Sequence, residues 1–206
     1  MSADGTVKMW KEPGESADCL LGSFRYKRST EGLTEVPTSA AWMLTHTSTL
    51  LIGYRAPILG VFDKLTGKSK GVIKFEVDGV QSLAAQQINR VVAHPFMNVA
   101  ITAHENKFIR FFDVNAGKHT RAMIAHTDAV SCLQVVGSTN LLVSGGHDGS
   151  IRCWDLRKFQ CVHEQPAHRR KYDESVMALS HHGALPLLAS SGADGIIKVF
   201  ETAHMF

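Results

Sequence analysis

An internal repeat constrains the fold of this chain more than any other feature of its sequence. Five segments share a similar ending, which is an aromatic residue that in four of them is followed directly by an acidic residue. The segments are SADGTVKMW (2–10), YRAPILGVFD (54–63), TAHENKFIRFFD (102–113), SGGHDGSIRCWD (144–155) and SSGADGIIKVFE (190–201). They recur at intervals of roughly 40 to 50 residues, near the length of a four-stranded propeller blade. The repeat predicts a series of similar sheets.

One complete period predicts four strands. Its short runs of β-forming residues, separated by turn residues, are 129–136, 140–146, 150–156 and 161–166. The dipeptide Asp148-Gly149 predicts a tight turn between the second and third runs, because glycine accepts a positive φ. The same dipeptide recurs at 4–5 and 194–195. Since no segment shows helical periodicity over three turns, we predict an all-β chain.

Composition excludes several protein classes. The 206 residues are 44% hydrophobic, and 22 Lys+Arg against 19 Asp+Glu give a net charge of +3 with histidine neutral. Such a chain is typical of soluble globular proteins rather than disordered ones. It contains no apolar run long enough to span a membrane, and its start, MSADGTVKMWKE, lacks the apolar core of a signal peptide. We therefore expect no membrane span and a cytoplasmic location.

Neither a metal site nor a cofactor is expected. The four cysteines are scattered and form no C-x-x-C pair, so the sequence predicts no zinc ribbon and no redox motif. His181 and His182 are adjacent on a predicted strand and point to opposite faces, so they are not expected to share an ion.

The complete period resembles the WD-repeat family. The matching residues are His126 near its start, Ser144 in its second strand, Asp148 in the turn and Trp154 at the end of the third strand. The family implies a β-propeller with blades around a central channel and partners on its faces. We predict a WD-repeat β-propeller with about four to five blades present, as part of a seven-bladed propeller.

These four side chains are expected to form one structural hydrogen-bond network within the blade. A buried indole N–H needs an acceptor, and a hydroxyl, an imidazole and a carboxylate can continue the chain of bonds. The fifth repeat keeps His168, Ser190 and Asp194 but has Phe200 in the tryptophan position. Serine, histidine and aspartate also form catalytic triads, but their recurrence with the repeat favours a scaffold. We predict no catalytic residue.

Other repeats depart from the pattern. The third repeat has Thr102, Asn106 and Phe112, with glutamines at 86–87 where a histidine is expected. The second repeat keeps little more than Gly53 and the aromatic-acid pair at 62–63. We expect such blades to depend more on packing than on the polar network.

The second half of the chain resembles the striatin family more specifically. The residues that carry this resemblance are INRVVAHP (88–95), ITAHENKFIRFFD (101–113), AHTDAVSCL (125–133), SGGHDGSIRCWDL (144–156), AHRRKYDES (167–175) and GADGIIKVF (192–200). The resemblance implies a non-enzymatic scaffold, a regulatory subunit of protein phosphatase 2A in STRIPAK assemblies that also hold kinases or adaptors. It places the family's caveolin-binding, coiled-coil and calmodulin-binding regions outside these residues, so those functions are not carried over.

The repeat phase divides the chain into predicted units: a partial blade at 1–10, a polar loop at 11–36, and blades at about 37–66, 87–120, 126–166 and 168–206. Seven blades need about 300 residues. We therefore expect a propeller fragment or an abbreviated gene product that is poorly soluble alone.

Two segments are candidate partner-binding sites. Arg169, Arg170 and Lys171 could meet acidic groups of a partner, with Tyr172 as an aromatic anchor. The segment at 89–90, which is Asn89 and Arg90, lies at a comparable phase of an earlier repeat. The alternatives are a solvated loop whose charges pair internally and, for the second segment, a strand cap.

Three other functions compete with the striatin-like scaffold. They are a generic WD-repeat adaptor of another complex, a non-functional truncated propeller, and an enzyme that uses the channel. The enzyme is disfavoured because the repeats place no converging carboxylates or histidines outside their structural positions. Nucleic-acid binding is not expected, since only 168–172 approaches a basic patch with an aromatic residue.

Overall fold

All the regular elements in the described residues are β-strands. The computed structural model describes residues 3–10, 20–26, 35–75, 86–137 and 139–202. The strands of the first half are β1 (Thr6–Trp10), β2 (Leu20–Arg25), β3 (Pro37–Trp42), β4 (Thr49–Tyr54), β5 (Ala56–Asp63), β6 (Ser69–Lys74), β7 (Ile88–Ala93) and β8 (Val99–His104). The remaining strands are β9 (Phe108–Asp113), β10 (Lys118–Ile124), β11 (Val130–Val135), β12 (Leu141–Gly146), β13 (Ser150–Asp155), β14 (Gln160–Pro166), β15 (Val176–His181), β16 (Leu187–Gly192) and β17 (Ile197–Glu201).

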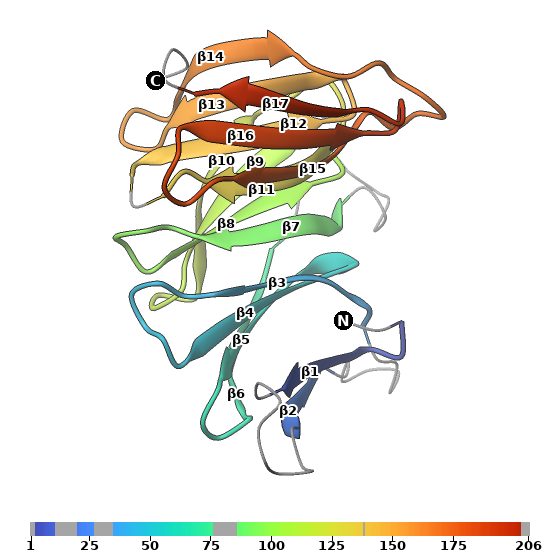
Figure 1. Ribbon diagram of the computed structural model, residues 1–206. Helices are drawn as coiled ribbons and strands as arrows, with labels where there is room; N and C mark the ends of the chain where they lie inside the picture. The colour runs from blue at the N-terminus through green and yellow to red at the C-terminus, as the bar shows by residue number, and fades with distance from the viewer. Residues whose placement is uncertain (1–2, 11–19, 27–34, 76–85, 138, 203–206) are drawn as a thin grey trace, which may run out of the picture.

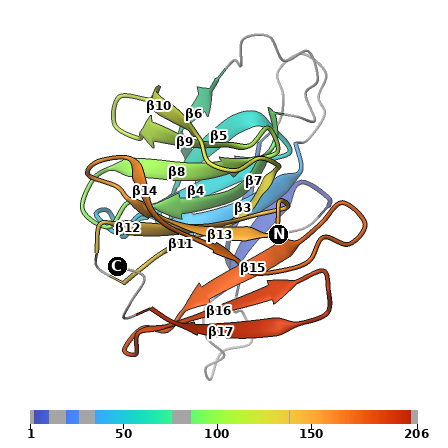
Figure 2. The same ribbon diagram turned by 90° about the horizontal axis from the view of Figure 1, so that it is seen from above.

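The strands form successive antiparallel blades. Strands β3–β6, β7–β10 and β11–β14 each make a four-stranded sheet, β15–β17 make a three-stranded sheet, and β1 pairs with β2. The sheets follow one another from β1–β2 at the bottom of Figure 1 to the C-terminal strands at the top. The first strands β3, β7, β11 and β15 lie next to one another along the inner side of the arc, as the view from above in Figure 2 shows. The predicted all-β propeller is therefore confirmed.

Two predicted blades continue further than expected. The first ends with β6 at Lys74 rather than at 66, and the second ends with β10 at Ile124 rather than at 120. Both outer strands have mainly exposed side chains, SKGVIK and KHTRAMI, so they lack the hydrophobic alternation that marks a strand in the sequence. Backbone pairing to β5 and β9 defines them instead.

The predicted polar loop at 11–36 was wrong in one part, because Leu20–Arg25 forms β2 and pairs with β1. Phe24 explains this strand. Its ring is 1% exposed and meets Phe62 of β5 edge-on, with 5.6 Å between ring centroids. Phe24 is the only buried side chain of this strand, whereas Leu20 and Leu21 are 45% and 52% exposed, so the strand lacks the apolar alternation that marks a strand in the sequence. Residues 11–19 and 27–34 of this predicted loop lie outside the described residues.

Tight turns follow the predicted Asp-Gly phase. Gly5, Gly149 and Gly195 have φ of 79°, 89° and 79°. At Gly149 a Cβ would also stand 2.5 Å from the carbonyl oxygen of His168. Both the positive φ and this close contact therefore exclude a side chain at the position. The turn is therefore packed against the loop that enters the next blade.

Neighbouring blades are joined by a repeated side-chain hydrogen bond. Thr38, Asn89 and Ser131 occupy the second position of β3, β7 and β11. Each donates to the carbonyl oxygen of the first residue of the next inner strand; these acceptors are Ile88, Val130 and Val176. The corresponding residue of β15 is Met177, which has no such donor. Three blade interfaces are therefore fixed in register by polar contacts.

Candidate functional site

The predicted blade network comes together in the β11–β14 sheet. Trp154 donates its indole N–H to Ser144 Oγ at 2.8 Å, and Ser144 Oγ lies 2.7 Å from His126 Nε2. His126 Nδ1 lies 3.0 Å from Asp148 Oδ1. Since the carboxylate can only accept, Nδ1–H donates to Asp148, and Nε2 accepts from the Ser144 hydroxyl. Each of these four side chains thereby has a hydrogen-bond partner within the network.

Asp148 anchors this network at the end of β12. It accepts hydrogen bonds from the backbone amides of Thr127 and Ser150, at 2.9 and 3.0 Å, besides that from His126. Burial by itself would raise the pKa of Asp148, but the hydrogen bonds from His126 and the two amides outweigh it and lower the pKa. The carboxylate is therefore ionised at neutral pH and is not a proton donor.

The β15–β17 sheet holds a shorter version of the same network. His168 Nε2 lies 2.7 Å from Ser190 Oγ, and His168 Nδ1 lies 3.1 Å from Asp194 Oδ1. Asp194 also accepts from the amides of Arg169 and Ile196, each at 3.1 Å. The residue in the tryptophan position is Phe200, which donates nothing. Ser190 therefore has one hydrogen-bond partner fewer than Ser144.

The β7–β10 sheet has no histidine before its first strand, and a different histidine, which the sequence pattern did not indicate, takes its place. Thr102 Oγ1 lies 2.7 Å from Nε2 of His104, two residues along the same strand and wholly buried. Burial, together with the charge of Arg110, lowers the pKa of His104 to about 3, although the backbone at Gln86 and Gln87 acts in the opposite direction. Strand alternation places residues 102 and 104 on one face, and this signal could have found the pair.

The serine, histidine and aspartate trio does not form an accessible reaction site. Ser144 and His126 are 0% and 1% exposed, and the serine oxygen already receives the Trp154 N–H. A substrate could reach the hydroxyl only by opening the blade. Burial also raises the pKa of Cys132 to about 11 and that of Cys153 to about 12, so neither thiol is a ready nucleophile.

The predicted basic segment forms a tight hairpin between β14 and β15. Lys171 and Glu174 exchange backbone hydrogen bonds of 2.8 and 3.0 Å, and Tyr172 and Asp173 between them have φ of 51° and 66°. Tyr172 is 89% exposed at the tip. Arg170 stiffens the base, since it contacts Asp128 at 2.9 Å and Asp173 at 3.1 Å. Arg169 and Lys171 are exposed beside the ring.

The second predicted segment divides between two roles. The Asn89 amide donates to Val130 O at 3.0 Å and to Glu105 at 2.9 Å, so it joins two blades. Arg90 instead lines a cavity on the inner strands. No ion pair or hydrogen bond within the described ranges joins either residue to the hairpin at 169–174. The structure does not combine the two segments into one site.

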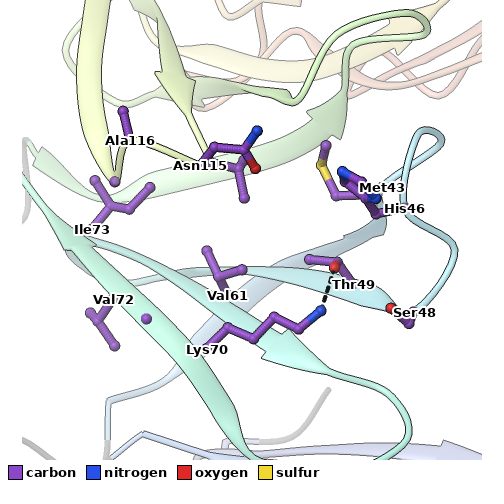
Figure 3. Close-up of a pocket in the computed structure, with 13 residues that line it drawn as sticks. Met43, His46, Ser48, Thr49, Val61, Lys70, Val72, Ile73, Asn115 and Ala116 are labelled. Atoms are coloured by element: carbon purple, nitrogen blue, oxygen red, sulfur yellow. Dashed lines mark hydrogen bonds between the residues drawn. The ribbon is translucent and has the colours of Figure 1, made fainter.

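A cavity of about 380 Å³ lies between the β3–β6 and β7–β10 sheets. Figure 3 shows Lys70 lying along the β3–β6 side of this cavity toward Thr49, to which its ammonium donates at 3.0 Å. The same ammonium contacts Asp63 at 3.0 Å. The amide of Thr66 and the bond from Lys70 lower the pKa of Asp63 to about 2. This cation is internally paired, so the cavity offers little charge to a ligand.

Across the described ranges, no group of three or more histidine, cysteine or acidic residues is arranged to hold a metal ion. Those ranges also contain no helix of the length and apolarity that a membrane crossing requires.

Comparison with known proteins gives matches of two kinds. The family model for the WD domain, G-beta repeat, matches residues 117–155 and 159–201. Human striatin-4 is 39% identical over 199 residues, and human striatin-3 is 39% identical over 200 residues. Each match covers 97% of this chain, but only 25% and 24% of the relative. The chain thus spans about a quarter of the length of these relatives.

Solved structures match the fold at lower sequence identity. The computationally designed Ika4 protein has a TM-score of 0.63 and 23% identity, and the match covers 88% of this chain and 96% of Ika4. U3-55K has a TM-score of 0.69 and 19% identity, with 84% of this chain and 51% of that protein covered. These likenesses support the blade architecture alone.

Proposed function

Because the chain belongs with the striatins, as a WD-repeat segment about a quarter of their length, we propose that it is a non-enzymatic interaction scaffold. The partner we assign to it is protein phosphatase 2A with associated kinases or adaptors, in a STRIPAK-type assembly in the cytoplasm. The observation that carries this proposal is the 39% identity to striatin-4, which extends over 97% of the chain.

The chemistry of the blades supports a binding role rather than turnover. The groups that resemble a catalytic trio, His126, Ser144 and Asp148, bond to one another and to Trp154 inside a sheet. They hold a blade in shape. A rigid scaffold of this kind positions the loops between strands, where partners bind.

The hairpin at 169–174 is the surface that we assign to a partner. Tyr172 is almost fully exposed, and its φ is positive. Bulky residues are uncommon at positive φ, so a tyrosine at this position of the turn favours a functional role for its ring. A tyrosine with basic neighbours matches the composition of binding hot spots, and Arg169 and Lys171 favour an acidic partner. The Arg170 contacts keep the hairpin ordered before binding, which lowers the entropy cost of association.

Affinity purification of the tagged chain from its own cells, followed by mass spectrometry, tests the proposal. We expect phosphatase subunits and kinases among the recovered proteins. The double variant Lys171→Ala/Tyr172→Asn should recover about fivefold less phosphatase, because hot-spot truncations commonly cost at least 1 kcal/mol. Asparagine tolerates the left-handed backbone, so the turn is preserved while the ring is removed.

Lys118→Ala is the matched control, since it removes an exposed lysine from β10, outside the hairpin. It should leave recovery unchanged. Absence of phosphatase from the wild-type sample would overturn the assigned partner in favour of an adaptor in another complex. Equal recovery with the double variant would exclude the hairpin as the contact.

A further inference from the structure

The inner strands of the four larger sheets line a second cavity, of about 360 Å³. Strands β3, β7, β11 and β15 all contribute to it, together with the turns that follow three of them. Most of the residues that line it are apolar, although almost half of its surface is polar, and Trp42 and Leu44 are 41% and 57% exposed. Convergence of four inner strands makes this the channel side of the propeller.

Arg90 is the exceptional residue of this cavity. The strand registers place Ser39, Arg90, Cys132 and Ala178 at one equivalent position of the four inner strands. Ser39 and Cys132 are buried, whereas Arg90 is exposed. Only this blade therefore places a long cationic side chain where the others have a small one.

The charge of Arg90 is not neutralised within the described part of the chain. None of the described residues lining the cavity is acidic, and none of the described residues forms an ion pair or hydrogen bond with the Arg90 side chain. Lys70 in the cavity of Figure 3 differs, because Asp63 pairs with it.

Two further residues give the cavity polar character, and only the first of them adds positive charge. The Lys64 ammonium lies 5.6 Å from the centroid of the Trp42 ring, so a second cation stands near the rim. Burial, with the charge of His182, lowers the pKa of His181, so at neutral pH the imidazole contributes a polar group without a charge. The cavity thus combines one guanidinium, a neutral imidazole and the Gln134 side chain with apolar walls.

We propose that this cavity binds an acidic peptide segment, with a carboxylate on Arg90 and the adjacent apolar side chains against Trp42 and Val135. The planar guanidinium presents paired N–H donors that match a carboxylate. Charge complementarity favours an acidic occupant, and the apolar wall favours one with hydrophobic neighbours. The site is separate from the hairpin and does not rest on the phosphatase assignment.

A titration of the purified 206-residue chain with two blocked pentapeptides tests this site. One peptide carries an aspartate between two leucines, and the other carries an asparagine in that place. Affinities and the affected backbone amides are measured by NMR. We expect the aspartate peptide to bind about tenfold more tightly, which corresponds to about 1.4 kcal/mol, with shifts confined to the inner strands.

Arg90→Gln should abolish the difference between the two peptides, whereas Arg90→Lys should retain part of it because the charge remains. Lys118→Gln is the matched control and should behave as wild type. Thermal unfolding checks that each variant folds. Equal affinity of the wild-type chain for both peptides would overturn the proposal without using any variant, as would an unchanged difference in folded Arg90→Gln.

Discussion

The β11–β14 blade and the β15–β17 sheet contain nearly the same polar network but bury their apolar side chains very differently. His126, Ser144 and Asp148 in the first correspond to His168, Ser190 and Asp194 in the second, with serine-to-histidine separations of 2.7 Å in both. In contrast, Ile151 and Cys153 are 0% exposed, while Ile197 and Val199 at the equivalent positions are 74% and 64% exposed.

The comparison separates two sources of order in this fold. The polar network is completed within one blade, because its donors and acceptors come from one sheet and its entering loop. Burial of the blade face is supplied by the following blade, since Val176 and Leu188 pack in one cluster with Ile151 and Cys153. A sheet can therefore have its network without a covered face.

Replacing Gly145 and the equivalent Ser191 by valine should give the largest difference in stability loss between the two regions. A Cβ on Gly145 would stand 2.6 Å from Val176 Cγ1 and 2.7 Å from Cys132 Sγ. We expect Gly145→Val to destabilise the chain by about 3 kcal/mol through overpacking, and the equivalent Ser191→Val to cost far less. Urea unfolding of both variants measures this. Equal losses would mean that the face of β16 is as tightly covered as that of β12.

Removal of the network histidines should have the next largest effect. His126→Ala leaves the buried Ser144 hydroxyl with one partner fewer and withdraws a donor from Asp148, so we expect a loss of about 3 kcal/mol. His168→Ala should cost about 2 kcal/mol, because the face of the β15–β17 sheet is more exposed, so water can replace the lost hydrogen bonds more easily. Denaturant unfolding gives both values. A larger loss for His168→Ala would reverse the ranking.

Acid should destabilise the chain through His104 of the β7–β10 blade. Its pKa in the folded chain, about 3, lies below the ordinary value of 6.5, so the unfolded state binds the proton more readily. Stability is therefore full above pH 6.5 and falls as pH decreases toward 3. We expect a loss of about 1 kcal/mol between pH 7 and 5.5 from this group. His104→Gln should flatten that part of the pH profile; an unchanged profile would assign the acid sensitivity elsewhere.

Exchange of the aromatic residues should produce the smallest effect. Trp154→Phe removes the indole donor to Ser144 and should cost about 1 kcal/mol, while the ring volume is largely retained. Phe200→Trp offers Ser190 a donor and should be neutral or slightly stabilising. Thermal unfolding of the two variants compares them directly. A destabilising Phe200→Trp would show that the half-covered sheet has no room for the indole.

Much of the fold was predictable because its signals are local. Asp148-Gly149 marks a turn, alternating side chains mark strands, and Trp154 marks the end of a third strand, each within a few residues. The outer strands β6 and β10 and the short β2 were placed less accurately. Their side chains are mostly exposed, so partner strands rather than periodicity define them.

The candidate site was less predictable, because it depends on distances between blades. Asn89 and Arg90 are neighbours in sequence, yet one joins β7 to β11 and the other lines the inner cavity. Neighbouring residues of a strand point to opposite faces, but the packing of the next blade decides which of the two meets β11.

The sequence by itself determined the repeat, the all-β class and the identity of the network residues in the two C-terminal sheets, since those bonds form within one repeat. Only the tertiary structure decided that Asn89 joins neighbouring blades. It also decided that Arg90 lines the cavity on the inner strands. Burial and charge pairing are set by what lies across an interface, and an interface brings together residues that are distant in the chain.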